Sequence, residues 1–327
     1  MPTKQRNVLI VGGAGYIGSH MIRCAQHAGY TPIVLDNLVT GHADAVGDVK
    51  LIIGDINDTV LLTQLFENYS FAAVMDFAAL AQVNESVNAP ARYYHNNVSG
   101  TLNLLRVMMN AKVKNFIYSS SAAVYGEPQY LPIDEKHPIA AVNPYGRSMW
   151  MVEQMLQDFS HSYDLNCAVL RYFNAAGADL HADLAERHNP ETHLIPLILQ
   201  VAKGQQQAVT IYGEDYPTLD GTCVRDYVHV SDICDAHLLV LQALLDGKRS
   251  CTYNLGTGHG YSVREVLTTA RIVTGNIIPS VISGRRAGDP AILVADASAI
   301  QQDLNWQPKY IKLSEIIQSA WEIFVTP

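Results

Sequence analysis

Three glycines near the start of the chain have the spacing of a phosphate-binding turn. Gly12, Gly15 and Gly18 follow an apolar run, Val8–Val11, that predicts a short buried strand, and the residues after them predict a helix over Ser19–Ala28. Because glycine has no Cβ atom, such a turn can tighten, and its backbone N–H groups can approach a pyrophosphate at the positive end of the helix. A glycine triplet alone is equally typical of an ordinary tight turn.

An acidic residue at the end of the next apolar run favours the phosphate-binding interpretation. Asp36 follows Ile33–Leu35 and lies 18 residues beyond Gly18, close to the spacing of the acidic residue in dinucleotide-binding folds. A carboxylate there accepts hydrogen bonds from the ribose hydroxyls of adenosine and repels a 2′-phosphate. The two signals together predict a dinucleotide site that takes NAD rather than NADP.

Other polar and small residues also follow apolar runs. Asp55 either faces the adenine or caps the next helix, a role that Asn57 or Asp58 could equally fill. The small-residue stretch Phe77–Ala79 either lets the backbone pass close to a cofactor or packs at a strand end. Ser119–Ser121 places three hydroxyl groups at another strand end.

The alternation of strands and helices predicts how these residues are brought together. Strand-like runs alternate with amphipathic helical segments, which is typical of a parallel sheet with helices on both faces. We therefore predict the α/β class, with a Rossmann-like doubly wound parallel sheet whose functional residues lie at the carboxyl ends of the strands. The predicted elements are the strands Val8–Val11, Ile33–Leu35, Lys50–Ile53, Ala73–Phe77, Phe116–Ser119 and Ala168–Arg171, and the helices Thr59–Asn68 and Ser99–Ala111 among others.

The regular alternation ends near residue 178. We predict an NAD-binding domain over residues 1–178 and a smaller C-terminal substrate lobe over residues 179–327, some segments of which return to the first domain. Ser314–Phe324 predicts a surface helix with an apolar stripe used for packing. Several loop-rich stretches suit a smaller lobe that closes over a substrate, namely Glu191–Pro196, Tyr212–Thr218, Asp220–Tyr227, Asn254–Gly258 and Arg285–Asp289.

Composition limits the classes of partner. The chain has 327 residues, 22 Lys and Arg against 31 Asp and Glu, and a net charge of −9, which argues against a general nucleic-acid surface. We expect no membrane span and no leader segment. Five scattered cysteines favour a reduced, cytoplasmic protein. Twelve histidines form no standard ligand motif, so we expect no metal.

Short motifs are spread along the whole chain, and the helix that follows Asn143 begins with one of them. The motifs, in order, are Gly12–His20, Asp36–Leu38, Asn84–Val87, Asn96–Val98, Ser119–Ala122, Asn143–Ser148, Leu170–Gly177, Asp220–Tyr227 and Arg285–Asp289. Together they resemble the motifs of the UDP-glucose (UDP-galactose) 4-epimerase family of extended short-chain dehydrogenases/reductases.

The resemblance implies a redox-neutral reaction on bound NAD. Tyr145 would take the proton from the sugar 4-hydroxyl while a hydride passes from C4 to NAD⁺, and Ser121 would hold the reacting oxygen. The 4-keto sugar would then turn over and receive the hydride on its other face. The cofactor contacts that the resemblance implies are Gly12, Gly15, Tyr16, Ile17, Gly18, Asp36, Asn37, Asp55, Ile56, Phe77, Ala78, Ala79, Asn96, Ser119, Tyr145 and Phe173.

Met149 departs from the family pattern at the position of a catalytic lysine. In the family that lysine lies one helical turn after the tyrosine, lowers its pKa and holds the nicotinamide ribose. A thioether carries no charge and can do neither. A nearby cation lowers a pKa by about 1–3 units, so its loss weakens the base by about 10- to 1,000-fold.

The resemblance also implies a UDP-sugar substrate. Arg225 and Arg286 would contact its diphosphate, since planar guanidinium groups pair well with phosphate oxygens. Leu293 lies where tyrosine excludes and cysteine admits a 2-acetamido group, so UDP-N-acetylhexosamines stay possible substrates. The remaining implied contacts are Ser121, Tyr145, Asn174, Leu194, Thr210, Tyr212 and Asp289.

Two alternatives remain open from the sequence. One is an NAD-dependent UDP-N-acetylglucosamine 5,6-dehydratase of the tunicamycin type, which also carries Y-x-x-x-M. The other is a protein that binds NAD and a UDP-sugar without catalysis. The helices near Asn97–Ala111 and Ser148–Phe159 are apolar enough to form a homodimer, as they do in the family, or to pack within one chain.

Overall fold

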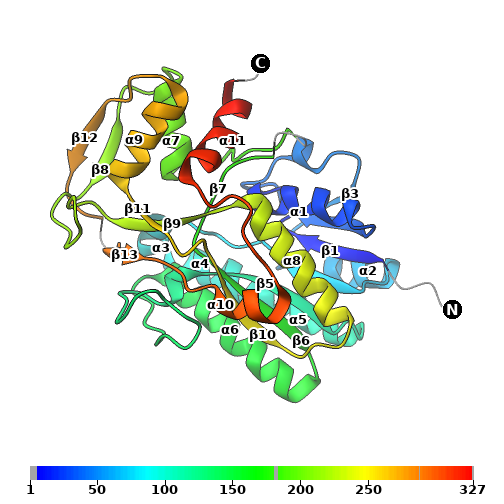
Figure 1. Cartoon of the computed structure of the whole chain (residues 1–327). Helices are drawn as coiled ribbons and strands as arrows, with labels where there is room; N and C mark the ends of the chain where they lie inside the picture. The colour runs from blue at the N-terminus through cyan, green and yellow to red at the C-terminus, as the bar shows by residue number, and fades with distance from the viewer. Residues whose placement is uncertain (1–5, 180–182, 287, 326–327) are drawn as a thin grey trace.

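The computed structural model describes residues 6–179, 183–286 and 288–325. It is built on a seven-stranded sheet in the order β10-β6-β5-β4-β1-β2-β3, in which every pairing is parallel (Figure 1). The predicted α/β class and doubly wound sheet are therefore confirmed. Its strands are β1 (Asn7–Val11), β2 (Thr31–Asp36), β3 (Lys50–Ile53), β4 (Ala73–Asp76), β5 (Asn115–Ser121), β6 (Asn166–Tyr172) and β10 (Cys251–Leu255).

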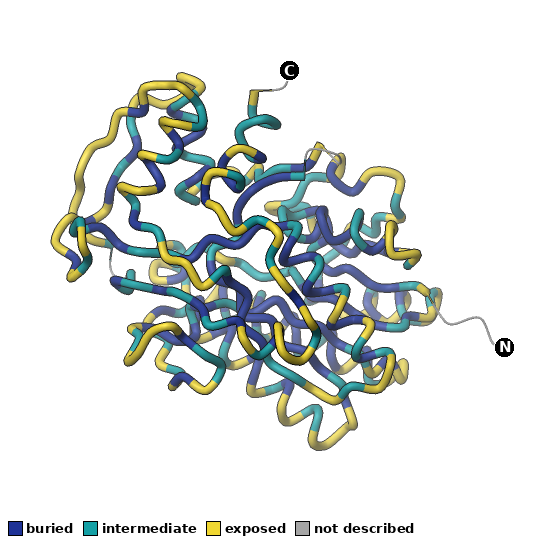
Figure 2. Tube along the Cα trace, in the orientation of Figure 1, coloured by how far each residue is buried: buried dark blue, intermediate teal, exposed yellow. Residues whose placement is uncertain are grey.

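Helices cover both faces of this sheet, and the central strands are buried between them (Figure 2). This burial explains why the strands read as continuous apolar runs instead of alternating ones. One face packs against α2 (Thr59–Asn68), α5 (Thr101–Asn110) and α6 (Pro144–Tyr163). The other face packs against α1 (Tyr16–His27), α8 (Val230–Leu245) and α10 (Ser298–Leu304).

Short helices connect the main elements of the first half. The helix predicted over Ser99–Ala111 is α5, which is preceded by a π-helical segment, η2 (Tyr94–Gly100). The others are η1 (Ala43–Val46), α3 (Val83–Asn88), α4 (Pro90–Tyr93) and η3 (Ala122–Val124).

The second half of the chain contributes a smaller lobe with a core of its own. Strand β9 (Val224–His229) pairs with β7 (Asn174–Ala176), β11 (Gly260–Ser262) and β13 (Ile292–Leu293). A second, two-stranded parallel sheet joins β8 (Val209–Tyr212) to β12 (Ser280–Ser283). The helices of the lobe are α7 (Leu194–Ala202), α9 (Val263–Thr274) and α11 (Leu313–Val325).

The second half of the chain differs from the sequence prediction in one strand, and part of it packs against the first half. The expectation of a loop over Asp220–Tyr227 was wrong, because β9 begins at Val224 and pairs with segments that are remote in the sequence. Strand β10 and helix α8 lie against the first sheet, so the two halves of the chain are interleaved (Figure 1). The domain boundary after residue 178 stays a prediction.

The strand order reverses between β1 and β4. The chain passes from β1 to β2 and β3 on one side, and then to β4 and β5 on the other. In open parallel sheets, such a reversal leaves a crevice at the carboxyl ends of the strands where ligands bind. The glycine turn at Gly12 and the stretch Phe77–Ala79 both lie at this point.

Candidate active site

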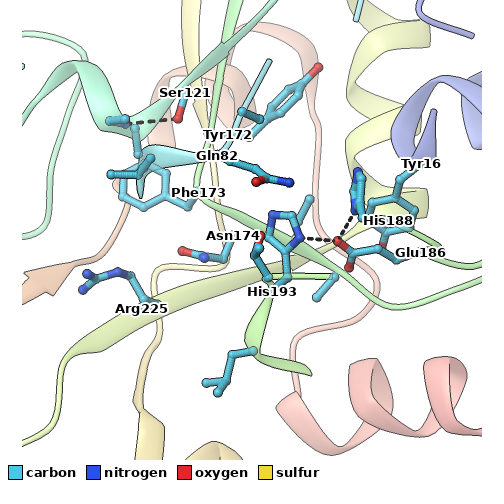
Figure 3. Close-up of a pocket in the computed structure, with 18 of the residues that line it drawn as sticks. Tyr16, Gln82, Ser121, Tyr172, Phe173, Asn174, Glu186, His188, His193 and Arg225 are labelled. Carbon is cyan, nitrogen blue, oxygen red and sulfur yellow. Dashed lines mark hydrogen bonds and ion pairs between the residues drawn. The ribbon is translucent and has the colours of Figure 1, made fainter. Parts of the chain in front are cut away.

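A cavity of about 460 Å³ lies where the carboxyl edge of the large sheet meets the smaller lobe. Residues from both halves of the chain line it (Figure 3). The cavity thus collects most of the predicted site residues at one place. Those that line it are Gly12, Gly15, Tyr16, Ile17, Gly18, Phe77, Ala79, Ser119, Ser121, Tyr145, Phe173, Asn174, Leu194, Thr210, Tyr212, Arg225, Arg286, Asp289 and Leu293.

The glycine turn has the geometry of a phosphate cradle. Gly12 has φ +74°, and a Cβ atom on it would lie 2.7 Å from the backbone nitrogen of Ala78. A Cβ atom on Gly18 would collide with the Gly12 carbonyl oxygen, whereas one on Gly15 would meet only that oxygen, at 3.3 Å. Gly15 precedes α1 without a side-chain cap, so the N–H groups of the first turn are open to a ligand. This turn fits the diphosphate of NAD.

Asp36 holds the glycine turn in place. Its two carboxylate oxygens accept hydrogen bonds from the backbone N–H groups of Ala14 and Leu38, at 2.9 and 2.8 Å. Burial raises the pKa of Asp36, and these two hydrogen bonds oppose that rise. Its predicted contact with the ribose stays a prediction.

The residues predicted to lie near the adenine form a hydrogen-bonded group beside Asp36. Asn37 donates to Asp55, which also accepts the backbone N–H of Asn57. The cap of α2 is Asp58, whose side chain accepts from Val60 and Leu61, so Asp55 does not fill the capping role. The predicted residues that do not line the cavity are Asp36, Asn37, Asp55, Ile56, Ala78, Asn96 and Met149.

Tyr145 and Ser121 reach the cavity from two different elements. Asn143 caps α6 by accepting the N–H of Gly146, and Pro144 opens the helix, so Tyr145 lies in its first turn. Ser121 ends β5 and accepts the N–H of Ala123. Burial raises the pKa of Tyr145, and a hydrogen bond with Ser121 opposes the rise. The pair can exchange a proton with a hydroxyl group in the cavity.

Met149 lies beneath this pair and away from the cavity. Its side chain is 1% exposed, and its Sδ atom accepts a hydrogen bond of 3.3 Å from the Tyr118 hydroxyl. The amide of Asn97 approaches the same sulfur at 3.9 Å. The sulfur thus accepts hydrogen bonds at the position where the family's lysine would donate them.

The arginines predicted for the substrate gather at the lobe side of the cavity. Asp289 lies 3.5 Å from Arg225 and 3.2 Å from Arg286. The guanidinium group of Arg286 stacks over Tyr212, 4.4 Å from the ring centre. Leu293 pairs in register with Arg225 between β13 and β9. These contacts place two cations, one aromatic ring and one apolar side chain around one part of the cavity.

A cluster of glutamates and histidines on the opposite wall was not predicted from the sequence. Glu186, His188 and His193 line the cavity near Tyr16 (Figure 3), and Glu191 belongs to the same cluster. The sequence feature that could have revealed this cluster is the closely spaced Glu and His residues at positions 186, 188, 191 and 193. This spacing matches no standard metal-ligand motif, so a search for such motifs does not find the cluster.

Comparison with known proteins identifies the family. Residues 8–256 match the model of the NAD dependent epimerase/dehydratase family. A UDP-glucose 4-epimerase of Halalkalibacterium halodurans is 48% identical over 96% of this chain and 94% of its own. The chain belongs to the NAD dependent epimerase/dehydratase family.

Solved members of this family share the fold. UDP-glucose 4-epimerase from Brucella ovis, solved with NAD, is 45% identical, with a TM-score of 0.94 over 98% of both chains. The enzyme from Bifidobacterium longum, solved with NAD⁺ and UDP, is 38% identical, with a TM-score of 0.92 over 97% of both chains. The resemblance inferred from the motifs is therefore confirmed. None of the helices in the described ranges combines the length and the apolar character that a membrane span requires.

Proposed function

We propose that this chain is an NAD-dependent UDP-sugar 4-epimerase. The observation that carries the proposal is that one cavity receives the glycine turn, the Tyr145–Ser121 pair and the Arg225–Asp289–Arg286 group. The first of these suits a dinucleotide, the second a reacting hydroxyl and the third a nucleoside diphosphate. Relatives that are named UDP-glucose 4-epimerases support the same reaction.

Different residues of the chain have different roles in this reaction. The glycine turn and the residues beside it would hold NAD⁺, which would supply the acceptor for the hydride of the sugar C4 atom. Tyr145 accepts the proton of the 4-hydroxyl on its phenolic oxygen and gives it back in the second half of the cycle. Ser121 holds the reacting oxygen beside the phenol. Arg225 and Arg286 hold the diphosphate, so that the sugar can turn over while the nucleotide stays in place.

Met149 makes this reaction slow. Because burial already raises the pKa of Tyr145, the base needs a neighbouring cation to work near neutral pH. The buried thioether at position 149 supplies none. We therefore expect a measurable but weak epimerase.

Incubation of the holoenzyme with UDP-galactose tests the proposal. Proton NMR should show slow conversion to UDP-glucose at unchanged mass, and Tyr145→Phe should abolish it. Loss of water from UDP-N-acetylglucosamine would instead establish the 5,6-dehydratase. Neither change, with NAD retained, would establish a protein that binds without catalysis.

The assembly and location of the chain are also part of the proposal. A cytoplasmic homodimer is the form that we expect, with α5 and α6 in the interface. The exposed Met151 and the half-buried Trp150 and Met155 of α6 support this placement, since they give that helix an apolar outer surface. Light scattering during size-exclusion chromatography should report twice the mass of one chain. Met151→Glu should shift it to the monomer.

A further inference from the structure

The loop between β7 and α7 carries a compact cluster of side chains that can bind a metal. Glu186, His188, Glu191 and His193 each offer one ligand atom, and all four atoms lie within 4.8 Å of one another. We propose that this cluster binds a divalent transition-metal ion of the zinc type. The proposal is independent of the epimerase reaction.

The distances within the cluster are close to those of a zinc site. The Nδ1 atoms of His188 and His193 lie 2.9 and 2.6 Å from the same oxygen of Glu186 (Figure 3). The Glu191 carboxylate lies 3.0 Å from His193 Nδ1 and 3.9 Å from His188 Nδ1. Tetrahedral ligands about 2.0–2.2 Å from zinc are roughly 3.4 Å apart. Small rotations of the side chains therefore suffice to admit an ion.

The donor set determines which ion fits. Imidazole nitrogen with carboxylate oxygen is a common set for zinc and other first-row metals. Mg²⁺ and Ca²⁺ prefer oxygen ligands alone. Two histidines among four ligands therefore favour a zinc-type ion.

Burial and charge support the same assignment. The side chains of Glu186 and Glu191 are only 7% and 5% exposed. Two carboxylates that are this buried need positive charge close to them. A divalent ion supplies it in full, and each histidine binds such an ion as a neutral imidazole. The occupied site is then neutral, which suits the wall of a cavity that takes diphosphates.

Neighbouring groups hold the ligands in place. Glu191 accepts the backbone N–H groups of Thr192 and His193, at 2.7 and 2.8 Å, and these bonds fix its orientation. The His188 ring meets the Tyr16 ring edge-on, 6.5 Å between centres. An ion here therefore fixes the loop against the start of α1, beside the phosphate cradle.

Metal titration of tag-free holoenzyme tests the site. After treatment with a chelator and its removal, the protein is titrated with Zn²⁺ by calorimetry and with Co²⁺ by visible absorption. We expect one ion per chain and a Co²⁺ spectrum of low coordination number. His193→Ala and Glu186→Gln should each weaken binding at least about 100-fold, since even outer-shell partners are worth roughly 10- to 100-fold. His161→Ala, which removes an exposed histidine of α6, should bind as the parent does.

Three results would overturn the proposal. They are the lack of saturable Zn²⁺ or Co²⁺ binding by the parent, parent-like binding by both cluster variants, and equal affinity for Mg²⁺. Circular dichroism and NAD content verify that each variant is folded. If His193→Ala fails to fold, metal binding by Glu186→Gln, which keeps the shape of the side chain, tests the proposal.

Discussion

A single side chain, at position 149, sets the expected rate of the proposed reaction. Met149→Lys places an ammonium group one helical turn after Tyr145, near the Tyr118 hydroxyl that now donates to the sulfur. A nearby cation lowers the pKa of a phenol, so the turnover of UDP-galactose should rise by about 10- to 1,000-fold. Stopped assays read by NMR measure the change.

Two variants of the same helix control for this substitution. Met149→Leu removes the sulfur without adding charge and should leave the rate within about threefold of the parent. Ser162→Lys adds the same charge at an exposed position near the C-terminal end of α6 and should not activate. An unchanged rate in Met149→Lys would contradict our account of Tyr145.

Leu293 is expected to set the substrate class. It is 8% exposed, lines the cavity and lies beside Arg225. Leu293→Tyr fills the space that a 2-acetamido group needs, so turnover of UDP-N-acetylglucosamine should fall at least about tenfold relative to UDP-galactose. Parallel assays of both substrates measure the ratio, and equal losses on both would show that Leu293 does not discriminate between them.

Among the elements, α6 depends on a buried ion pair to hold Tyr145 in place. Arg171 of β6 and Glu153 of α6 are 2.6 Å apart, with side chains 5% and 2% exposed, and Ser120 of β5 donates to the same glutamate. Glu153→Ala leaves a buried, unpaired guanidinium group and should lower the free energy of unfolding by about 3–5 kcal/mol. Urea denaturation measures the loss. Lys114→Ala, which breaks an exposed ion pair, should unfold close to the parent.

Two glycine substitutions in the turn between β1 and α1 distinguish an effect on cofactor binding from an effect on folding. Gly15→Ala adds a methyl group that meets only one oxygen, at 3.3 Å, so the protein should fold. Because Gly15 lines the cavity at the predicted diphosphate position, the added methyl group should lower NAD affinity at least about tenfold. Gly18→Ala, whose methyl group meets backbone atoms, should lower stability as well. NAD content and thermal unfolding, measured together, distinguish the two outcomes.

At the scale of the whole molecule, two buried histidines predict sensitivity to acid. Burial lowers the pKa of both His229 and His237 to about 4, from 6.5 in the unfolded chain. The unfolded state therefore binds more protons below pH 6.5, and stability falls from there until about pH 4. Each histidine should account for about 3 kcal/mol of this loss. Urea midpoints measured from pH 7 to pH 4 should show the decline.

A substitution at His237 separates its contribution from that of His229. His237 Nε2 lies 2.7 Å from the Tyr172 hydroxyl, and Nδ1 lies 2.9 Å from the Ile233 carbonyl oxygen. His237→Gln keeps one donor and one acceptor but cannot gain a proton, so the pH dependence should flatten. His27→Gln, at an exposed histidine, is the control. A decline as steep as the parent's would exclude His237 as a source.

Local sequence determined the scaffold of this protein. The run Val8–Val11, the glycine turn after it and Asp36 form a continuous local pattern, and the structure has β1, the cradle and the end of β2 there. The helix Thr59–Asn68 was predicted to the residue because Asp58 caps it locally. Such features depend on neighbours within a few positions, which the sequence displays directly.

Only the tertiary structure decided how distant segments meet. Strand β9 was missed because its partners β7, β11 and β13 are far from it in the chain. The sulfur of Met149 on α6 accepts a hydrogen bond from the Tyr118 hydroxyl of β5, and His188 of the Glu186–His193 cluster contacts the ring of Tyr16, which is remote in the sequence. A sequence records which groups are available, whereas burial and long-range contacts fix their charge, their partners and therefore their chemistry.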